Sequence, residues 1–174
     1  PRAHPPAYTI LNDCPPRDLQ GVEMRVNLGP ARARAPPPPL GPWLVTADEL
    51  EPHRNADGFL DLALTVAVNG ETVGRDRLSN MAWTFEEMAA YASRGTWIRP
   101  GDVLGSGTCG NGGCLAELWG RGGSLEAPPL APGDLVTMTV EGIGTIINTI
   151  IEGVAPVPGP SPPRQHLPPP GRPA

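Results

Sequence analysis

The chain has 174 residues, of which 25 are proline and 22 are glycine, a share at which sequences begin to look low-complexity or disordered. The formal net charge is only −5, so charge repulsion does not force the chain open. The 13 basic residues are all arginines and are scattered, which argues against nucleic acid as a partner. No apolar run is long enough for a transmembrane helix, so we expect no membrane partner.

The prolines gather toward the two ends of the chain. Ten lie in residues 1–39 and nine in residues 156–173, which leaves six for the middle. We therefore expect a proline-rich end at residues 1–6, one domain at residues 7–152 and a disordered tail at residues 153–174.

The first residue and the cysteines suggest where the chain comes from. The sequence begins with Pro1 rather than methionine and has no apolar leader, so we expect a fragment of a longer protein. Its three cysteines, Cys14, Cys109 and Cys114, cannot form a framework of paired disulfides. This favours the reducing cytoplasm.

The first expected elements are short. Residues 7–13 predict a strand that runs into a turn, and Pro15-Pro16 suits the first turn of a short helix. Residues 29–39 predict an irregular or extended loop. Residues 46–52, which include the carboxylates of Glu49 and Glu51, predict a solvated turn.

A β-hairpin is the clearest pattern. Apolar residues alternate from Leu60 to Val68, as expected for a half-buried strand. Asn69-Gly70 follows, and both residues tolerate the positive φ of a two-residue turn. Residues 71–78 should return as the second strand.

A helix and further strands complete the pattern. Thr84 and Glu87 form a capping box, which predicts a helix that ends near Arg94-Gly95. Two Pro-Gly-Asp turns lead into residues 103–108 and 135–140, and residues 142–151 predict a last strand. The fold should be mostly β (α+β), a roll, barrel or sandwich with one or two short helices.

The polar residues after the first strand allow two interpretations. Asn12 and Asp13 could cap the following helix, with Arg17 paired to a neighbouring aspartate. Alternatively, Asp13 is an oxygen ligand for a divalent cation, and Arg17 and Gln20 face an anionic or carbonyl substrate.

A glycine-rich segment at residues 105–113 also allows two interpretations. It is either a flexible turn or a loop that brings backbone N–H groups close to a ligand oxygen. It matches neither a Walker A loop nor a Rossmann fingerprint. Cys109 and Cys114 lack partners at zinc spacing, so we expect ordinary thiols.

In order along the chain, several motifs resemble the C-terminal catalytic domain of the fumarylacetoacetate hydrolase family. The resemblance covers roughly residues 7–152, and the segment from Cys114 to Gly120 is closer to the fumarylacetoacetase-like branch. The matching motifs are Tyr8 to Asp13 with Arg17 to Gln20, Leu28-Gly29-Pro30, Leu40 to Trp43, Val68 to Glu71, Pro100 to Thr108, Leu130 to Asp134 and Val140 to Thr145.

The resemblance implies a homodimeric, mixed β-roll hydrolase that cleaves a carbon–carbon bond in a small 1,3-diketo acid. It implies Mg²⁺ or Ca²⁺, or Mn²⁺, with Asp13 as a metal ligand. It also implies that Arg17, Gln20 and Thr108 line the substrate site and that Arg34 stands where the family has a catalytic lysine.

The sequence also departs from the family's pattern. The family's upstream Glu-x-Glu metal ligands and water-activating histidine have no counterpart before Asp13, so we expect weak metal binding. Two alternatives therefore stay open: a catalytically silent, truncated family member, and a related isomerase or decarboxylase that acts through a metal-bound enolate.

Overall fold

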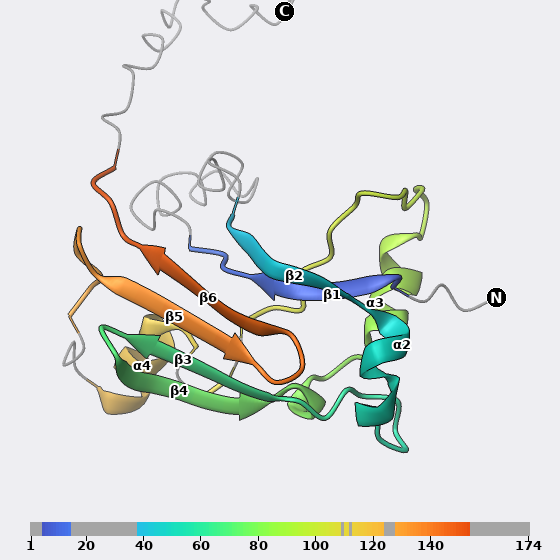
Figure 1. Cartoon of the computed structure of the whole chain (residues 1–174), viewed down its shortest axis with the longest axis horizontal. Coiled ribbons are helices and arrows are strands. Elements are labelled where there is room, and N and C mark those ends of the chain that lie inside the picture. Colours follow the sequence, from blue (N-terminus) through green and yellow to red (C-terminus); the bar gives the residue numbers. More distant parts are fainter. Residues whose placement is uncertain (1–4, 15–37, 109, 112, 124–127, 154–174) are drawn as a thin grey trace, which may run out of the picture.

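The computed structural model describes residues 5–14, 38–108, 110–111, 113–123 and 128–153. Within these residues the chain forms a two-stranded sheet, a four-stranded sheet and three short α-helices (Figure 1). The predicted mostly β class is confirmed, with one α-helix more than expected.

The smaller sheet pairs two strands that are far apart in the sequence. Strand β1 (Ala7–Leu11) runs antiparallel to β2 (Leu40–Thr46). The predicted first strand is confirmed, although it ends at Leu11. The second was not predicted from the pattern of the sequence, because Gly41 and Pro42 interrupt it and both are poor strand formers.

The larger sheet has the order β4-β3-β5-β6, with antiparallel pairing throughout. Strands β3 (Ala63–Val68) and β4 (Glu71–Arg77) form the predicted hairpin, and Asn69 and Gly70 have φ values of 51° and 84°. Strands β5 (Leu135–Val140) and β6 (Gly144–Thr149) complete it. Figure 1 shows β6 beside β2, where the two sheets meet.

The hydrophobic core fills the space between the two sheets. Leu62 is fully buried, and Leu50 and Leu60 are each only 2% exposed. Both sheets and the loops between them contribute to this single cluster, which consists of Tyr8, Ile10, Val45, Leu50, Leu60, Leu62, Val140, Ile143 and Ile146. The core therefore links β1 to the larger sheet and fixes the position of the residues that follow β1.

Helix α3 (Phe85–Ala92) begins as the sequence predicts. The Thr84 hydroxyl accepts a hydrogen bond from the Glu87 backbone N–H at 3.2 Å, and the Glu87 carboxylate accepts one from the Thr84 N–H at 2.8 Å. The ring of Phe85 packs edge-on against Tyr8 with centroids 4.9 Å apart. The capping box therefore sets the start of the helix, and the ring contact attaches it to β1.

Residues 46–52 correct one prediction. They form helix α2 (Ala47–Leu50) and the 3₁₀ helix η2 (Glu51–His53) rather than a turn. Burial of Leu50 in the core stabilises these short helices, and that long-range contact leaves no local sequence signal.

Two further segments differ from expectation. Residues 103–108 form no strand, and helix α4 (Leu115–Gly122), which follows the glycine-rich segment, was not predicted. The last strand is shorter than expected: Gly142, with φ of 74°, lies in the turn before it, and Gly144, with φ of 125°, is its first residue. A short 3₁₀ helix η3 (Leu78–Asn80) follows β4. In the described part of the chain, no helix is long and apolar enough to cross a membrane.

The stability of the fold should depend on pH through Asp61. Its carboxylate lies 2.6 Å from Arg77 Nε and accepts a hydrogen bond from the Ser79 hydroxyl at 2.7 Å. These contacts hold the pKa of Asp61 below its usual value. A lowered folded-state pKa stabilises the fold above the unfolded-state pKa, and this contribution is lost as the pH falls through the folded-state value.

We therefore expect Asp61→Asn to lower the urea midpoint at pH 7, and we expect the difference from wild type to shrink below about pH 4. Asp57→Asn, which changes an exposed carboxylate nearby, is the control and should leave the midpoint almost unchanged. A difference between wild type and Asp61→Asn that is the same at both pH values would contradict this assignment.

Candidate functional site

The Asn-Asp pair lies directly after β1. Asn12 is only 9% exposed, whereas Asp13 is exposed. The Asn12 backbone N–H donates to the Pro39 carbonyl at 3.1 Å, and its side-chain amide donates to Oδ1 of Asn148 at 2.9 Å. The fold therefore fixes Asn12 from two directions and presents Asp13 at the surface.

One end of the glycine-rich segment lies against Leu11, the residue before this pair. A Cβ atom added to Gly105 would lie 3.2 Å from Cδ2 of Leu11, which is tighter than an ordinary contact. Glycine thus allows the backbone at position 105 to lie against Leu11 at the end of β1. Thr108, a predicted substrate-binding residue, is exposed three positions further along.

Gly110, inside the segment, is held by Asp76 on β4. A Cβ atom added to Gly110 would lie only 2.5 Å from an oxygen of the Asp76 carboxylate. The pKa of Asp76 is lowered, first by a hydrogen bond from the Asn80 side chain and then by bonds from the Arg77 and Gly110 backbone N–H groups. We did not identify Asp76 from the sequence, because no local pattern connects it to a loop more than thirty residues away.

Of the predicted site residues, the structure describes Asp13 and Thr108. Gly105, three positions before Thr108, lies against Leu11, two positions before Asp13. Arg17, Gln20 and Arg34 lie outside the described residues, so their placement stays a prediction.

The described residues do not by themselves provide a metal site. They contain no group of three His, Cys, Asp or Glu side chains that could hold an ion. Glu49 and Glu51 lie in α2 and η2, and Glu51 forms an ion pair with Arg54 at 2.9 Å. Asp13 is therefore a carboxylate of the right type, but the described residues do not fit a divalent cation.

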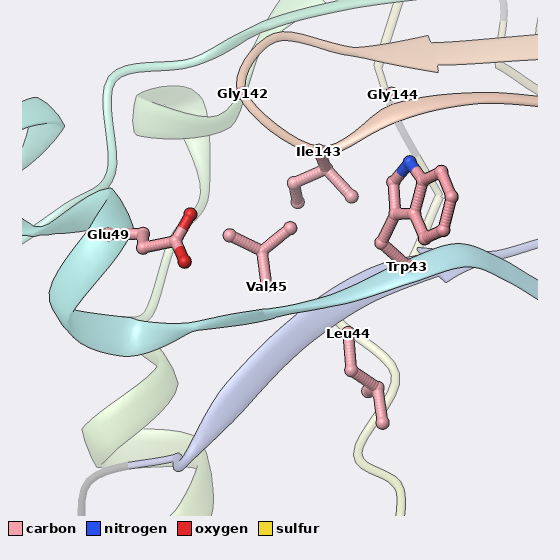
Figure 2. Close-up of a pocket in the computed structure, with 7 residues that line it drawn as sticks. All are labelled: Trp43, Leu44, Val45, Glu49, Gly142, Ile143 and Gly144. Carbon is pink, nitrogen blue, oxygen red and sulfur yellow. The ribbon is translucent and has the colours of Figure 1, made fainter.

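A second feature is an open pocket of about 560 Å³ between β2, α2 and the β5–β6 turn. Figure 2 shows Trp43, Val45 and Ile143 facing one another, with the Glu49 carboxylate at one end and Leu44 on the other side of β2. Among the residues that line it, only Glu49 carries a titratable side chain, and none is a predicted site residue. The pocket therefore lacks the paired groups that acid–base catalysis uses.

Comparison with known proteins bears directly on the resemblance. The sequence model of the family described as fumarylacetoacetate (FAA) hydrolase C-terminal matches residues 6–151. The chain is 28% identical over 145 residues to the 4-hydroxyphenylacetate degradation bifunctional isomerase/decarboxylase of Salmonella dublin, with 83% of this chain and 28% of that protein covered.

Two solved structures have the same fold. The 5-carboxymethyl-2-hydroxymuconate delta-isomerase of Mycobacterium smegmatis is 31% identical with a TM-score of 0.61, and the match covers 84% of this chain and 48% of that one. Fumarylacetoacetate hydrolase from psychrophilic Exiguobacterium antarcticum is 27% identical with a TM-score of 0.63, and the match covers 84% and 47%. The chain thus spans about half the length of these structures and less of the Salmonella protein.

Proposed function

Because the chain belongs to the fumarylacetoacetate hydrolase family, we propose that it forms part of a metal-dependent hydrolase that cleaves a carbon–carbon bond in a fumarylacetoacetate-like 1,3-diketo acid. The observation that carries this proposal is the family match across residues 6–151, with an exposed Asp13 after β1 and Gly105 of the glycine-rich segment against Leu11 at the end of that strand. The named hydrolase of the same fold supports the reaction type.

Each residue of the site has a proposed role in handling the substrate. Thr108 can donate a hydrogen bond to a substrate oxygen, and its loop can offer backbone N–H groups to developing negative charge. Arg17 and Gln20 would orient the substrate's carboxylate and carbonyl groups, and Arg34 would supply positive charge. Asp13 would contribute one carboxylate to the binding of Mg²⁺, Ca²⁺ or Mn²⁺.

Completion of the site requires groups from outside the described residues. A hard divalent cation takes six or more oxygen ligands, and the described residues contain no cluster that could hold one. We propose that the remaining carboxylates and the water-activating base belong to the part of these two relatives that this chain does not span. A homodimer in the cytoplasm is part of the same proposal.

An isomerase or decarboxylase is the second candidate. It is favoured by the names of two relatives, an isomerase at 31% identity and a bifunctional isomerase/decarboxylase at 28%. A shared fold does not fix the reaction, so the fold by itself does not choose between these candidates. A truncated, catalytically silent member of the family is the third candidate.

Product analysis distinguishes these candidates. A longer protein, in which this chain follows the upstream half of the Exiguobacterium relative, would be incubated with a fumarylacetoacetate-like diketo acid and Mn²⁺. We expect two carboxylic-acid fragments that together contain one added water, as measured by mass spectrometry. A product of unchanged mass would indicate isomerisation, loss of carbon dioxide would indicate decarboxylation, and unchanged substrate would support the silent alternative.

The chain alone should bind Mg²⁺ weakly. With one family carboxylate present, we expect a dissociation constant of about 0.1 mM or higher, since affinity rises with the number of charged ligands. Isothermal titration calorimetry measures this directly, with Asp13→Asn as the control. A micromolar site in the wild-type chain would show that it contains ligands beyond Asp13.

A further inference from the structure

Three separate segments meet at the two residues that precede Asp13. Gly105 packs against Leu11, the Pro39 carbonyl accepts the Asn12 backbone N–H, and Asn148 accepts the Asn12 side-chain amide. The contact with Asn148 connects positions 136 residues apart. The direction in which the chain leaves β1 is therefore set by tertiary contacts as well as by the strand itself.

Asn148 differs from Pro39 and Gly105 because it belongs to a regular strand. It lies within β6 and is paired in register with Val136, whereas Pro39 and Gly105 belong to segments without regular structure. β6 is itself joined through β5 to the centre of the larger sheet. Asn148 is thus the point at which the larger sheet holds the Asn-Asp pair by a hydrogen bond between side chains.

Burial gives this hydrogen bond its importance. Asn12 is only 9% exposed, so its amide cannot readily exchange Asn148 for bulk water. A buried amide without a hydrogen-bond partner lowers the stability of the fold. A shift of the chain that gives the Asn12 amide a new partner is therefore favoured. Because Asp13 is the next residue, such a movement would change the position of its carboxylate.

We propose that Asn148 is a positioning residue that fixes the Asn12–Asp13 backbone, and hence the Asp13 carboxylate, in the candidate site. This inference rests on the proposed function for the role of Asp13, but the contact itself is tested independently. The important chemical feature is an acceptor oxygen at position 148, so aspartate should replace asparagine there and alanine should not.

Amide hydrogen exchange followed by NMR tests the contact in the 174-residue chain. We expect Asn148→Ala to speed hydrogen exchange of the Asn12 backbone N–H by about tenfold. The Val66 backbone N–H, in the inner strand β3, should change little. Asn148→Asp should restore slow exchange. Thr145→Ala is the matched control. Thr145 lies in β6, as Asn148 does, and its truncation removes a 2.8 Å side-chain hydrogen bond to Thr139 of β5.

Three results of this measurement would overturn the proposal. They are an unchanged Asn12 exchange rate in Asn148→Ala, equal acceleration at Asn12 and Val66, and a failure of Asn148→Asp to restore protection. If the alanine variant does not fold, Asn148→Val removes the acceptor while keeping a good strand former, and the same criteria apply.

Turnover by the longer protein tests the consequence for the site. We expect Asn148→Ala to lower kcat by about tenfold and Asn148→Asp to recover most of the lost activity. A loss of about this size is typical when a group that orients a ligating side chain is removed. Full kcat in Asn148→Ala would refute the positioning role. A wild-type protein without turnover would instead count against the proposed function, while the exchange rates would still decide whether Asn148 fixes Asn12.

Discussion

Leu62→Ala is expected to lower the free energy of unfolding by about 2–5 kcal/mol. Leu62 is fully buried and packs in the cluster between the two sheets. Its truncation loses apolar burial and leaves a cavity that the surrounding strands can fill only in part. Domains typically have a total of about 5–15 kcal/mol, so this loss should be visible as a much lower urea midpoint.

Leu44→Ala is the matched control for this change. Leu44 is 75% exposed on β2, so the same truncation should cost less than about 0.5 kcal/mol. Equal losses for the two variants would show that Leu62 is not at the centre of the core. A large loss for Leu44 alone would show that its face of β2 is covered in solution.

Asp13→Ala is expected to lower kcat/KM of the longer protein by more than about 100-fold. Loss of groups that merely support a metal ligand typically costs about 10–100-fold, and a direct ligand should matter more. Asp13 is exposed, so its truncation should leave the urea midpoint almost unchanged. Activity and stability should therefore respond separately, as expected for a functional carboxylate.

Glu49→Gln is the control for the loss of one carboxylate. Glu49 lies on α2 beside the open pocket, away from the Asn-Asp pair in the sequence. Its substitution by glutamine should leave kcat/KM within about twofold of the wild-type value. If Asp13→Ala retained wild-type turnover, Asp13 would have only the capping role that its sequence context also allows.

Local signals in the sequence determined several elements of the fold correctly. The β3–β4 hairpin follows from alternation and from Asn69-Gly70, whose positive φ values the turn needs. The start of α3 follows from Thr84 and Glu87, which bond to each other's backbone. In both cases the stabilising contacts are between residues only a few positions apart, so the sequence pattern itself contains the reason for the structure.

The family and the candidate Asp13 were also accessible from the sequence, because the motifs occur in a fixed order along the chain. Their order identified the family without any knowledge of strand pairing. The roles of Arg17, Gln20 and Arg34 still rest on that resemblance, since these residues lie outside the described part of the chain.

Only the tertiary structure decided which distant residues support the site. The pairing of β2 with β1, the bond between Asn12 and Asn148 and the contact of Asp76 with Gly110 all join segments more than twenty residues apart. Each depends on the closure of a long loop, and local propensity does not specify which partner it will meet. The sequence therefore determined the hairpin, the helix cap and the family, whereas core packing and sheet register decided how Asn12, the neighbour of Asp13, is held.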